Sequence, residues 1–509
     1  MNYRLPLVFA LVTSCNILFF QKLYSQQIAF DTVLSAAFVD TGIIYYGKKD
    51  FSNALNYFEK ASKLNNSKAK YFVGYLYQQG EGVKKDLAEA LLWYKKSSEN
   101  GYSDGQASIG YIYLNGLGTG IDYKEALRWL QLSVLQNNQS AQNMIGYMYS
   151  NGYGVEKNDS IAAHFSLLSA QQGNDVAQHN IALKYANGIG VKRDDTKAVY
   201  WYEKAALQGD KNAQANLALL YNSGTGTPKD SKKAVYWYTK AAENGLAMAQ
   251  CNLGYAYDQG NGVEKDIKKA AEWYLAAAIQ GNADAQCNLG KFYELGSGVL
   301  QDYRQAFRWY EAAAKQELPR GCRWLGQLYE KGLGVEKNNE KALEYYLQAA
   351  KQNDEWSQNF MGFMYQYGRG VEANLPIASE WYKKAADQKL PDAMNNYAWV
   401  CFLQNKNLFE AKLMTAESLR LDPDNFYTMD TYAHILFLEQ AYPLAEEWQK
   451  KALQKGGNKL SSYVETYGDI LFKLGKEKDA IKHWKEASKL PNATALLLKK
   501  IAAKQYIAE

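Results

Sequence analysis

The chain has 509 residues, and its 58 lysines and arginines nearly balance its 53 aspartates and glutamates. This balance, together with the lack of a basic run or patch, excludes the electrostatic footprint of a nucleic-acid-binding protein. Only eight prolines and no low-complexity tract are present, so long linkers are not expected.

Residues 1–25 have the features of an export signal. Arg4 gives a positive start, Leu5 to Phe20 is largely apolar, and Ser25 precedes a plausible cleavage site. The apolar stretch is short for a membrane span. A second interpretation is a lipoprotein signal, because Val12-Thr13-Ser14-Cys15 resembles a bacterial lipobox. The sequence therefore predicts an exported protein in the periplasm, at the outer-membrane surface or outside the cell, with a membrane contact only if Cys15 is lipidated.

The segment from 35 to 68 carries small and aromatic residues at helical spacing, namely Gly42, Tyr45, Ala54, Phe58 and Ala61. This pattern is similar to the tetratricopeptide repeat (TPR), which is a pair of antiparallel helices. We expect one TPR-like repeat here.

A tyrosine then recurs every 36 residues. Gly or Ala stands three residues before each tyrosine, and a G-x-G follows three residues after it. A fixed period of this length predicts stacked copies of one supersecondary unit. The nine tyrosines are Tyr77, Tyr113, Tyr149, Tyr185, Tyr221, Tyr257, Tyr293, Tyr329 and Tyr365.

One period predicts two helices. Leu217 and Tyr221 lie on one face of a first helix, which Gly224 ends because glycine tolerates a left-handed conformation. Asp230 stands where it would cap the second helix. Trp237 represents a recurring aromatic position that we expect in the core. The G-x-G pairs are interpreted as turns between helices, since neither a preceding strand nor G-K-[ST] accompanies them.

The nine units from about Ala69 to Asp392 resemble the SEL-one-like repeat (SLR) family, a relative of the TPR. The unit that starts with Ala249-Gln250-Cys251-Asn252-Leu253-Gly254 and includes Trp273-Tyr274 is a close match. The resemblance implies an all-α fold, a right-handed α-α superhelix (SLR/TPR solenoid) of antiparallel helix pairs. It also implies adaptor or regulatory work rather than chemistry.

The array is followed by further helical patterns. Ala445, Gly468 and Trp484 belong to segments that match the TPR, and about three TPR repeats are expected over 393–490. Residues 491–509 are expected to form a capping helix, because the last repeat of a solenoid has an outer face without a neighbour.

The cysteines outside the signal are predicted to be buried small hydrophobes rather than a disulfide framework. Cys251 and Cys287 are one period apart, where stacked helices lie about 8–10 Å from each other, farther than a disulfide allows. Cys322 and Cys401 have no clear partner.

A polar stripe on the first helices is the main binding candidate. Asn180, Asn216, Asn252 and Asn288 precede the small residue by two positions, and Asn187 follows it by five. An asparagine amide both donates and accepts, so it can pair with a peptide backbone whatever its side chains. The alternative is that these amides only bond neighbouring helices.

Toward the N-terminal end the groove turns aromatic, with Tyr75, Tyr111 and Tyr147. Tyrosine gives contact area at low entropic cost, which suits partner recognition. The alternative is that these rings fill the joint with the preceding repeat.

No catalytic residue, metal site or cofactor site is predicted. His164, His179, His434 and His483 stand outside known catalytic or metal motifs. The leading hypothesis is an exported, non-enzymatic interaction scaffold that binds a protein or extended peptide in its concave groove. An envelope hydrolase and a lipid-anchored envelope assembly factor are the alternatives.

Overall fold

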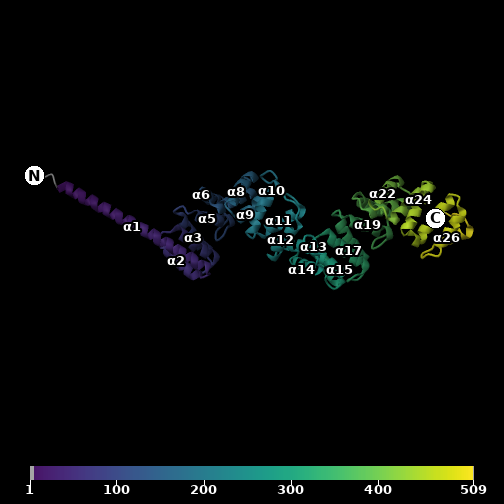
Figure 1. The fold of residues 1–509 in the computed structure, drawn as a ribbon, viewed down its shortest axis with the longest axis horizontal. Coiled ribbons are helices and arrows are strands. Elements are labelled where there is room, and N and C mark those ends of the chain that lie inside the picture. Colours follow the sequence, from purple (N-terminus) through teal and green to yellow (C-terminus); the bar gives the residue numbers. More distant parts are fainter. Residues whose placement is uncertain (1–4, 508–509) are drawn as a thin grey trace. The chain divides into compact units, whose positions relative to one another are not determined.

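The computed structural model describes the backbone of residues 5–507 and the side chains of residues 25–507. Its regular structure is helical, and consecutive helices pack in antiparallel pairs (Figure 1). The predicted all-helical solenoid of paired helices is confirmed. The chain divides into two compact units, one ending at Leu246 and the other starting at Ala247.

Unit 1 holds the first helix pairs. Their bounds are α1 (Leu5–Gly47), α2 (Phe51–Lys63), α3 (Ser67–Gln79), α4 (Leu87–Ser98), α5 (Ser103–Asn115), α6 (Tyr123–Val134), α7 (Gln139–Asn151), α8 (Asp159–Gln171), α9 (Asp175–Asn187), α10 (Asp195–Leu207), α11 (Lys211–Ser223) and α12 (Ser231–Glu243).

Unit 2 continues with helix pairs of the same kind and ends with a single helix. Its elements are α13 (Ala247–Gln259), α14 (Ile267–Ile279), α15 (Ala283–Leu295), α16 (Tyr303–Ala314), α17 (Pro319–Lys331), α18 (Asn339–Ala350), α19 (Glu355–Tyr367), α20 (Leu375–Asp387), α21 (Pro391–Gln404), α22 (Leu408–Leu421), α23 (Phe426–Leu438), α24 (Tyr442–Lys455), the short 3₁₀ helix η1 (Gly457–Lys459), α25 (Ser461–Lys473), α26 (Glu477–Ala487) and α27 (Ala495–Ala503).

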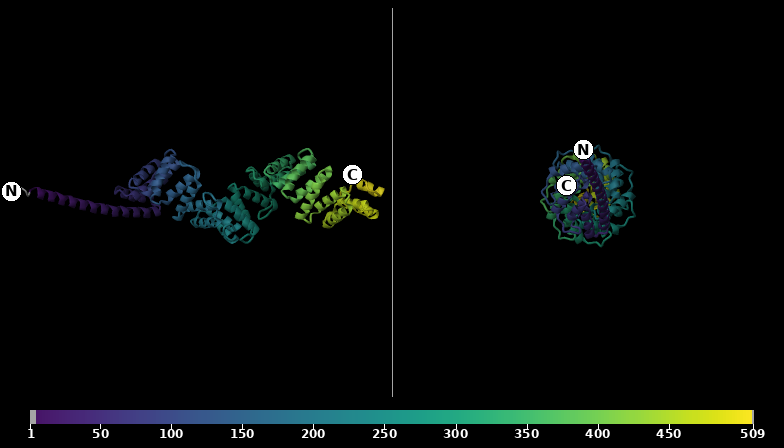
Figure 2. Two further views of the ribbon diagram at one scale, coloured as in Figure 1. Left: turned by 90° about the horizontal axis from the view of Figure 1, so that it is seen from above. Right: turned by 90° about the vertical axis from the view of Figure 1, so that its left-hand side faces the viewer.

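The first helix, α1, is a single rod that extends beyond the helix pairs (Figure 2). It passes the expected cleavage site at Ser25 without a break, and its last turns pack on α2, where Val39 is buried and Gly42 lies against the ring of Phe58. The stretch Ser25–Gly47 is long and apolar enough to cross a membrane by length and composition. Because it lies near the N-terminus, it is consistent with a signal sequence.

The local signals of the repeat are as predicted. In the pair α11–α12, Gly224 ends the first helix with a φ of 76°, and the carboxylate of Asp230 accepts a hydrogen bond from the backbone N–H of Lys233 at 3.0 Å. The predicted caps of the other second helices accept equivalent bonds: Asp86, Asp122, Asn158, Asp194, Asp266, Asp302, Asn338 and Asn374.

The second glycine of several G-x-G pairs lies close against the backbone of the preceding repeat, which a simple turn would not require. Gly190 has a φ of 70°, and a Cβ placed on it would lie 1.9 Å from the carbonyl oxygen of Asp159, at the start of the preceding repeat's second helix. Gly226 meets Asp195 in the same way, at 2.3 Å. These glycines therefore set how closely adjacent repeats stack.

The recurring tryptophan position is buried as predicted at Trp237, but less buried than predicted in other repeats. Trp93 and Trp273 are only half-buried, whereas the tyrosine that follows each of them, Tyr94 or Tyr274, is fully buried. The tyrosine points between the helices, and its burial raises the pKa of the Tyr274 hydroxyl. In the core the hydroxyl keeps a partner: Tyr310 donates to the carboxylate of Glu294 at 2.8 Å.

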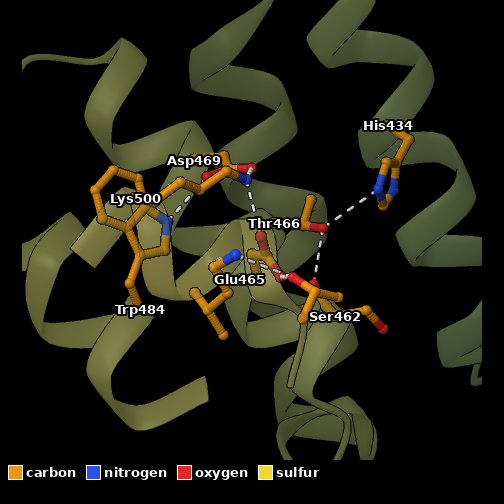
Figure 3. A network of polar contacts seen from close by, with 9 residues as sticks. His434, Ser462, Glu465, Thr466, Asp469, Trp484 and Lys500 are labelled. Carbon is orange, nitrogen blue, oxygen red and sulfur yellow. Dashed lines mark hydrogen bonds and ion pairs between the residues drawn. The ribbon is translucent and has the colours of Figure 1, made fainter. Parts of the chain in front are cut away.

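The last helix, α27, is held by a buried ion pair (Figure 3). Lys500 is 2% exposed, and its Nζ lies 2.9 Å from Oε1 of Glu465 and 2.7 Å from Oδ2 of Asp469, both on α25. Trp484 donates from its indole Nε1 to the other oxygen of Asp469 at 2.9 Å. Burial raises the pKa of Asp469 to about 6, although Lys500 opposes the shift.

Candidate functional site

The first helices of successive pairs lie against each other in unit 1, since α3 contacts α5 and α5 contacts α7. Four positions on each of these helices, spaced i, i+4, i+7 and i+11, project to one side. None of the residues at these positions is buried. We call them the inner face of unit 1: Asp104, Ser108, Tyr111 and Asn115 on α5; Ser140, Met144, Tyr147 and Asn151 on α7; Val176, Asn180, Leu183 and Asn187 on α9; and Asn212, Asn216, Leu219 and Ser223 on α11.

The predicted asparagines of unit 1 lie on this face, but they already have partners within the chain. Asn180 is half-buried and donates to the side-chain oxygen of Asn143 on α7, at 3.3 Å. Asn216 is hydrogen-bonded to the hydroxyl of Tyr202, which belongs to the preceding helix pair. Both amides thus connect neighbouring repeats.

Asn187 is exposed at the end of α9 and donates to the carbonyl oxygen of Leu183 at 3.0 Å. Asn115 and Asn151 make the same bond to Tyr111 and Tyr147. Each of these amides thus folds back onto a carbonyl one turn earlier on its own helix, so its nitrogen is engaged within that helix.

The other two predicted asparagines, Asn252 on α13 and Asn288 on α15, belong to unit 2. Both are half-buried at the same position of their helices. The predicted stripe is therefore divided between the two units.

The predicted tyrosines Tyr75 and Tyr111 line a pocket on unit 1. It has a volume of about 160 Å³ and lies between α3, α4, α5 and α7. Tyr71, Tyr94 and the carboxylate of Asp104 complete its charged and aromatic lining. Tyr75 also packs edge-on against Tyr46 of α1, with ring centroids 6.2 Å apart, so it both lines the pocket and fills the joint with the preceding repeat.

Tyr147 lies outside the pocket lining and contacts Tyr153 edge-on, with ring centroids 5.7 Å apart. It is 48% exposed and stands at the position that Tyr111 occupies on α5, where the exposed fraction is 41%.

Two further exposed residues on the inner face of unit 1 were missed by the sequence analysis. Leu183 and Leu219 stand at the position of Tyr111 and Tyr147 on the next two first helices, and they are 41% and 51% exposed. The repeat phase could have found them, because they too follow the small residue of the first helix by one position.

The cysteine thiols and His179 lie in the surroundings of structural residues. The cysteines Cys251, Cys287, Cys322 and Cys401 are free and buried, as predicted, and burial raises the pKa of Cys251 to about 12. His179 lies 3.2 Å from the Asp210 carboxylate that caps α11. Within residues 25–507 no group of three or more His, Cys, Asp or Glu side chains could hold a metal ion.

Comparisons with known proteins identify the repeat. The profile of the Sel1 repeat matches residues 39–66, 67–102, 103–138, 139–174, 175–210, 211–246, 247–282, 283–318, 319–354 and 357–390. The chain belongs to the Sel1 repeat family. The first of these ten matches covers the segment that we expected to be TPR-like; the TPR assignments at 35–68 and 393–490 stay predictions.

This Sel1 repeat protein is similar to a solved protective antigen present in uropathogenic Escherichia coli strains, which displays an SLR fold. The two are 28% identical, with a TM-score of 0.72, and the match covers 92% of this chain and 98% of the antigen. A Sel1 repeat protein from Oxalobacter formigenes is 30% identical over 63% of this chain and 91% of its own, with a TM-score of 0.47. A search of curated proteins found no match.

Family membership bears on function at a coarse level. Sel1 repeat solenoids are typical of protein-interaction adaptors and are generally non-catalytic. Repeat solenoids of this type bind proteins.

Proposed function

We propose that this Sel1 repeat protein is an exported, non-enzymatic scaffold that binds an extended segment of a protein partner on the inner face of unit 1. The observation that carries the proposal is a row of exposed apolar and aromatic side chains, one from each successive first helix: Tyr111, Tyr147, Leu183 and Leu219. Contiguous exposed apolar surface with a polar rim is a mark of interaction sites.

The spacing of the row suits an extended peptide. Packed helices lie about 8–10 Å apart, and an extended chain advances about 3.3 Å per residue. Successive repeats would therefore meet about every third residue of the bound segment. Because Asn180 and Asn216 already connect repeats, the apolar row supplies the main contact area and the asparagines hold its shape.

The exposed oxygen of Asn187 leaves one acceptor for a peptide N–H, since only its amide nitrogen is engaged by Leu183. Asn252 and Asn288 remain candidate contacts on unit 2 by the same chemistry.

A charge-insertion experiment tests the binding face. The double variant Leu183→Glu/Leu219→Glu places two carboxylates in the row, and Leu92→Glu places one at a comparably exposed leucine of α4, 45% exposed. Protein captured from the cell envelope by the wild-type chain should be lost with the double variant and retained with Leu92→Glu. Equal retention by all three proteins would contradict the proposal.

Export rests on the apolar N-terminal helix and on the signal-like pattern of residues 1–25. Mass spectrometry of the mature protein tests it. We expect a free Gln26 at the N-terminus; an acylated Cys15 would instead identify a lipid-anchored protein, and an intact Met1 would contradict export by cleavage.

A further inference from the structure

We infer that the tyrosine pocket of unit 1 binds a basic side chain, arginine or lysine, of the partner segment. This inference rests on the proposed function, because it names the chemistry of one anchor within the same face. The pocket is defined by Tyr71, Tyr75, Tyr94, Tyr111, Asp104 and Ser108.

The pocket is large enough for a side chain. A volume of about 160 Å³ far exceeds the roughly 10–15 Å³ of cavity space that one water needs. Its lining comes from α3, α4, α5 and α7, so the walls are held by four packed helices rather than by a loop.

The charge of the lining is negative. Asp104 is the one charged residue among those that line the pocket. Its carboxylate faces Tyr71, whose pKa is raised to about 12 by burial and by the negative charge of Asp104. The Tyr71 hydroxyl therefore stays neutral at physiological pH, and the Asp104 carboxylate would repel a second carboxylate or a phosphate.

The rings reinforce the preference for a cation. Tyr71 lies at the centre of a cluster, with centroid distances of 5.7 Å to Tyr94, 5.7 Å to Tyr102 and 6.4 Å to Tyr75. The face of an aromatic ring is electron-rich and attracts lysine or arginine within about 6 Å.

The same chain uses this contact elsewhere, but not here. Lys197 lies 5.2 Å from the ring centre of Tyr185, and Lys233 lies 5.1 Å from that of Tyr221. Within residues 25–507 no lysine or arginine lies over the rings of Tyr71, Tyr75 or Tyr111, none of which is fully buried; Tyr94 is fully buried and forms only the floor of the pocket lining. The pocket thus combines a carboxylate with ring faces that no cation of the described chain occupies.

An apolar side chain or a neutral amide side chain would match the chemistry of the pocket less well than a cation. The Asp104 carboxylate accepts a hydrogen bond from the amide of Asn138 at 2.7 Å and another from the Tyr102 hydroxyl, but it has no cationic partner. An apolar side chain would leave it without an opposite charge in a partly enclosed space, which is unfavourable. A neutral amide side chain could bond to Ser108, but it would gain no attraction from the rings.

Small-molecule probes test the inference. N-acetyl-arginine amide, N-acetyl-glutamine amide and N-acetyl-glutamate amide can each be titrated into the full chain and followed by saturation-transfer NMR. We expect the arginine probe to bind most tightly and its affinity to fall with rising salt, because the interacting charges are solvent-accessible. The glutamate probe should bind least.

Two substitutions locate the binding. Asp104→Asn removes the charge at nearly constant shape and should weaken the arginine probe by about fivefold, the upper range for a solvent-accessible ion pair. Tyr111→Leu removes one ring and should weaken it by about two- to fivefold. The matched control is Asp175→Asn, another first-turn carboxylate, exposed on α9 outside the pocket; it should leave the affinity unchanged.

The outcomes separate the two proposals. Equal binding of the arginine and glutamine probes, or equal effects of Asp104→Asn and Asp175→Asn, would overturn the pocket inference even if partner capture still depends on Leu183 and Leu219. If capture does not depend on those leucines, the proposed function fails, whatever the probes show. Thermal denaturation of each variant checks that the fold is intact.

Discussion

The side chain of Asn180 donates a hydrogen bond to Asn143, 37 residues earlier in the chain and one repeat away. Asn396 makes the same bond to Asn359, again across 37 residues, at 3.0 Å. At the C-terminal end, where the repeats are shorter, Lys500 takes the donor's place and Glu465 the acceptor's, across 35 residues. One geometric relationship between adjacent repeats is thus met by an amide pair in two places and by an ion pair in a third.

The amide pair should contribute measurably to stability. We expect Asn180→Ala to lower the free energy of unfolding by about 1 kcal/mol, the usual worth of one hydrogen bond. Asn187→Ala is the control and should change it by less than about 0.5 kcal/mol, because its exposed amide bonds only to a carbonyl of its own helix. Urea denaturation of both variants provides the measurement, and equal effects would contradict a repeat-linking role for Asn180.

The close approach at Gly190 should tolerate no side chain. Gly190→Ala combines a left-handed backbone with a Cβ 1.9 Å from the Asp159 carbonyl oxygen, and we expect it to destabilise the protein by about 3 kcal/mol. Gly173→Ala separates the two causes. Gly173 also has a positive φ, 100°, but no atom within 4 Å of its Cβ position, so only about 1 kcal/mol of strain is expected. Thermal melting of the two variants provides the measurement. Similar losses of stability would show that the close approach of adjacent repeats at Gly190 adds no cost of its own.

Removing the cation from the C-terminal joint should release α27. Lys500→Met leaves Glu465, 8% exposed, without its ion-pair partner, and breaking a buried pair in this way costs about 3–5 kcal/mol. Limited proteolysis should cut near α27 in this variant before it cuts elsewhere. The neighbouring Lys499 is exposed, so Lys499→Met should keep the wild-type pattern. Unchanged protection of α27 in Lys500→Met would show that the apolar contacts of Leu497 suffice.

Asp469 should make the joint sensitive to pH. Its folded pKa of about 6 is above the ordinary value of 3.8, so the folded protein binds this proton more tightly than the unfolded one. Its contribution to stability is therefore greatest below about pH 4 and is lost as the pH rises through about 6, by roughly 3 kcal/mol in total. Urea midpoints of the wild type and of Asp469→Asn, compared between pH 4 and pH 7, measure it. As the pH rises from 4 to 7, the urea midpoint of the wild type should fall relative to that of Asp469→Asn. A constant difference between the two midpoints would refute the raised pKa of Asp469.

The buried thiols should resist modification. Burial raises the pKa of Cys251 to about 12 and of Cys287 to about 11, and the thiolate is the reactive form. In a Cys15→Ser background, a disulfide-exchange reagent at pH 8 should label almost no thiol in the folded chain and four after denaturation. Rapid labelling of the folded protein would contradict the packing described for these sites.

The sequence by itself determined the helix pairs, their caps and their turns. Residues such as Gly224 and Asp230 act within a few positions of their own place in the chain, and local chemistry repeated at a fixed period is readable without a structure. Helical spacing also placed Tyr75, Tyr111 and Asn180 on the first helices.

Only the tertiary structure decided what those side chains do there. Whether an amide is available to a partner depends on the rotation and distance between adjacent repeats, and these bring Asn180 to Asn143 and Asn216 to Tyr202. The same contacts bring Asp104 of one repeat to Tyr71 of the one before it, where they enclose a pocket. A pocket is a property of several helices at once, so no single period of the sequence contains it.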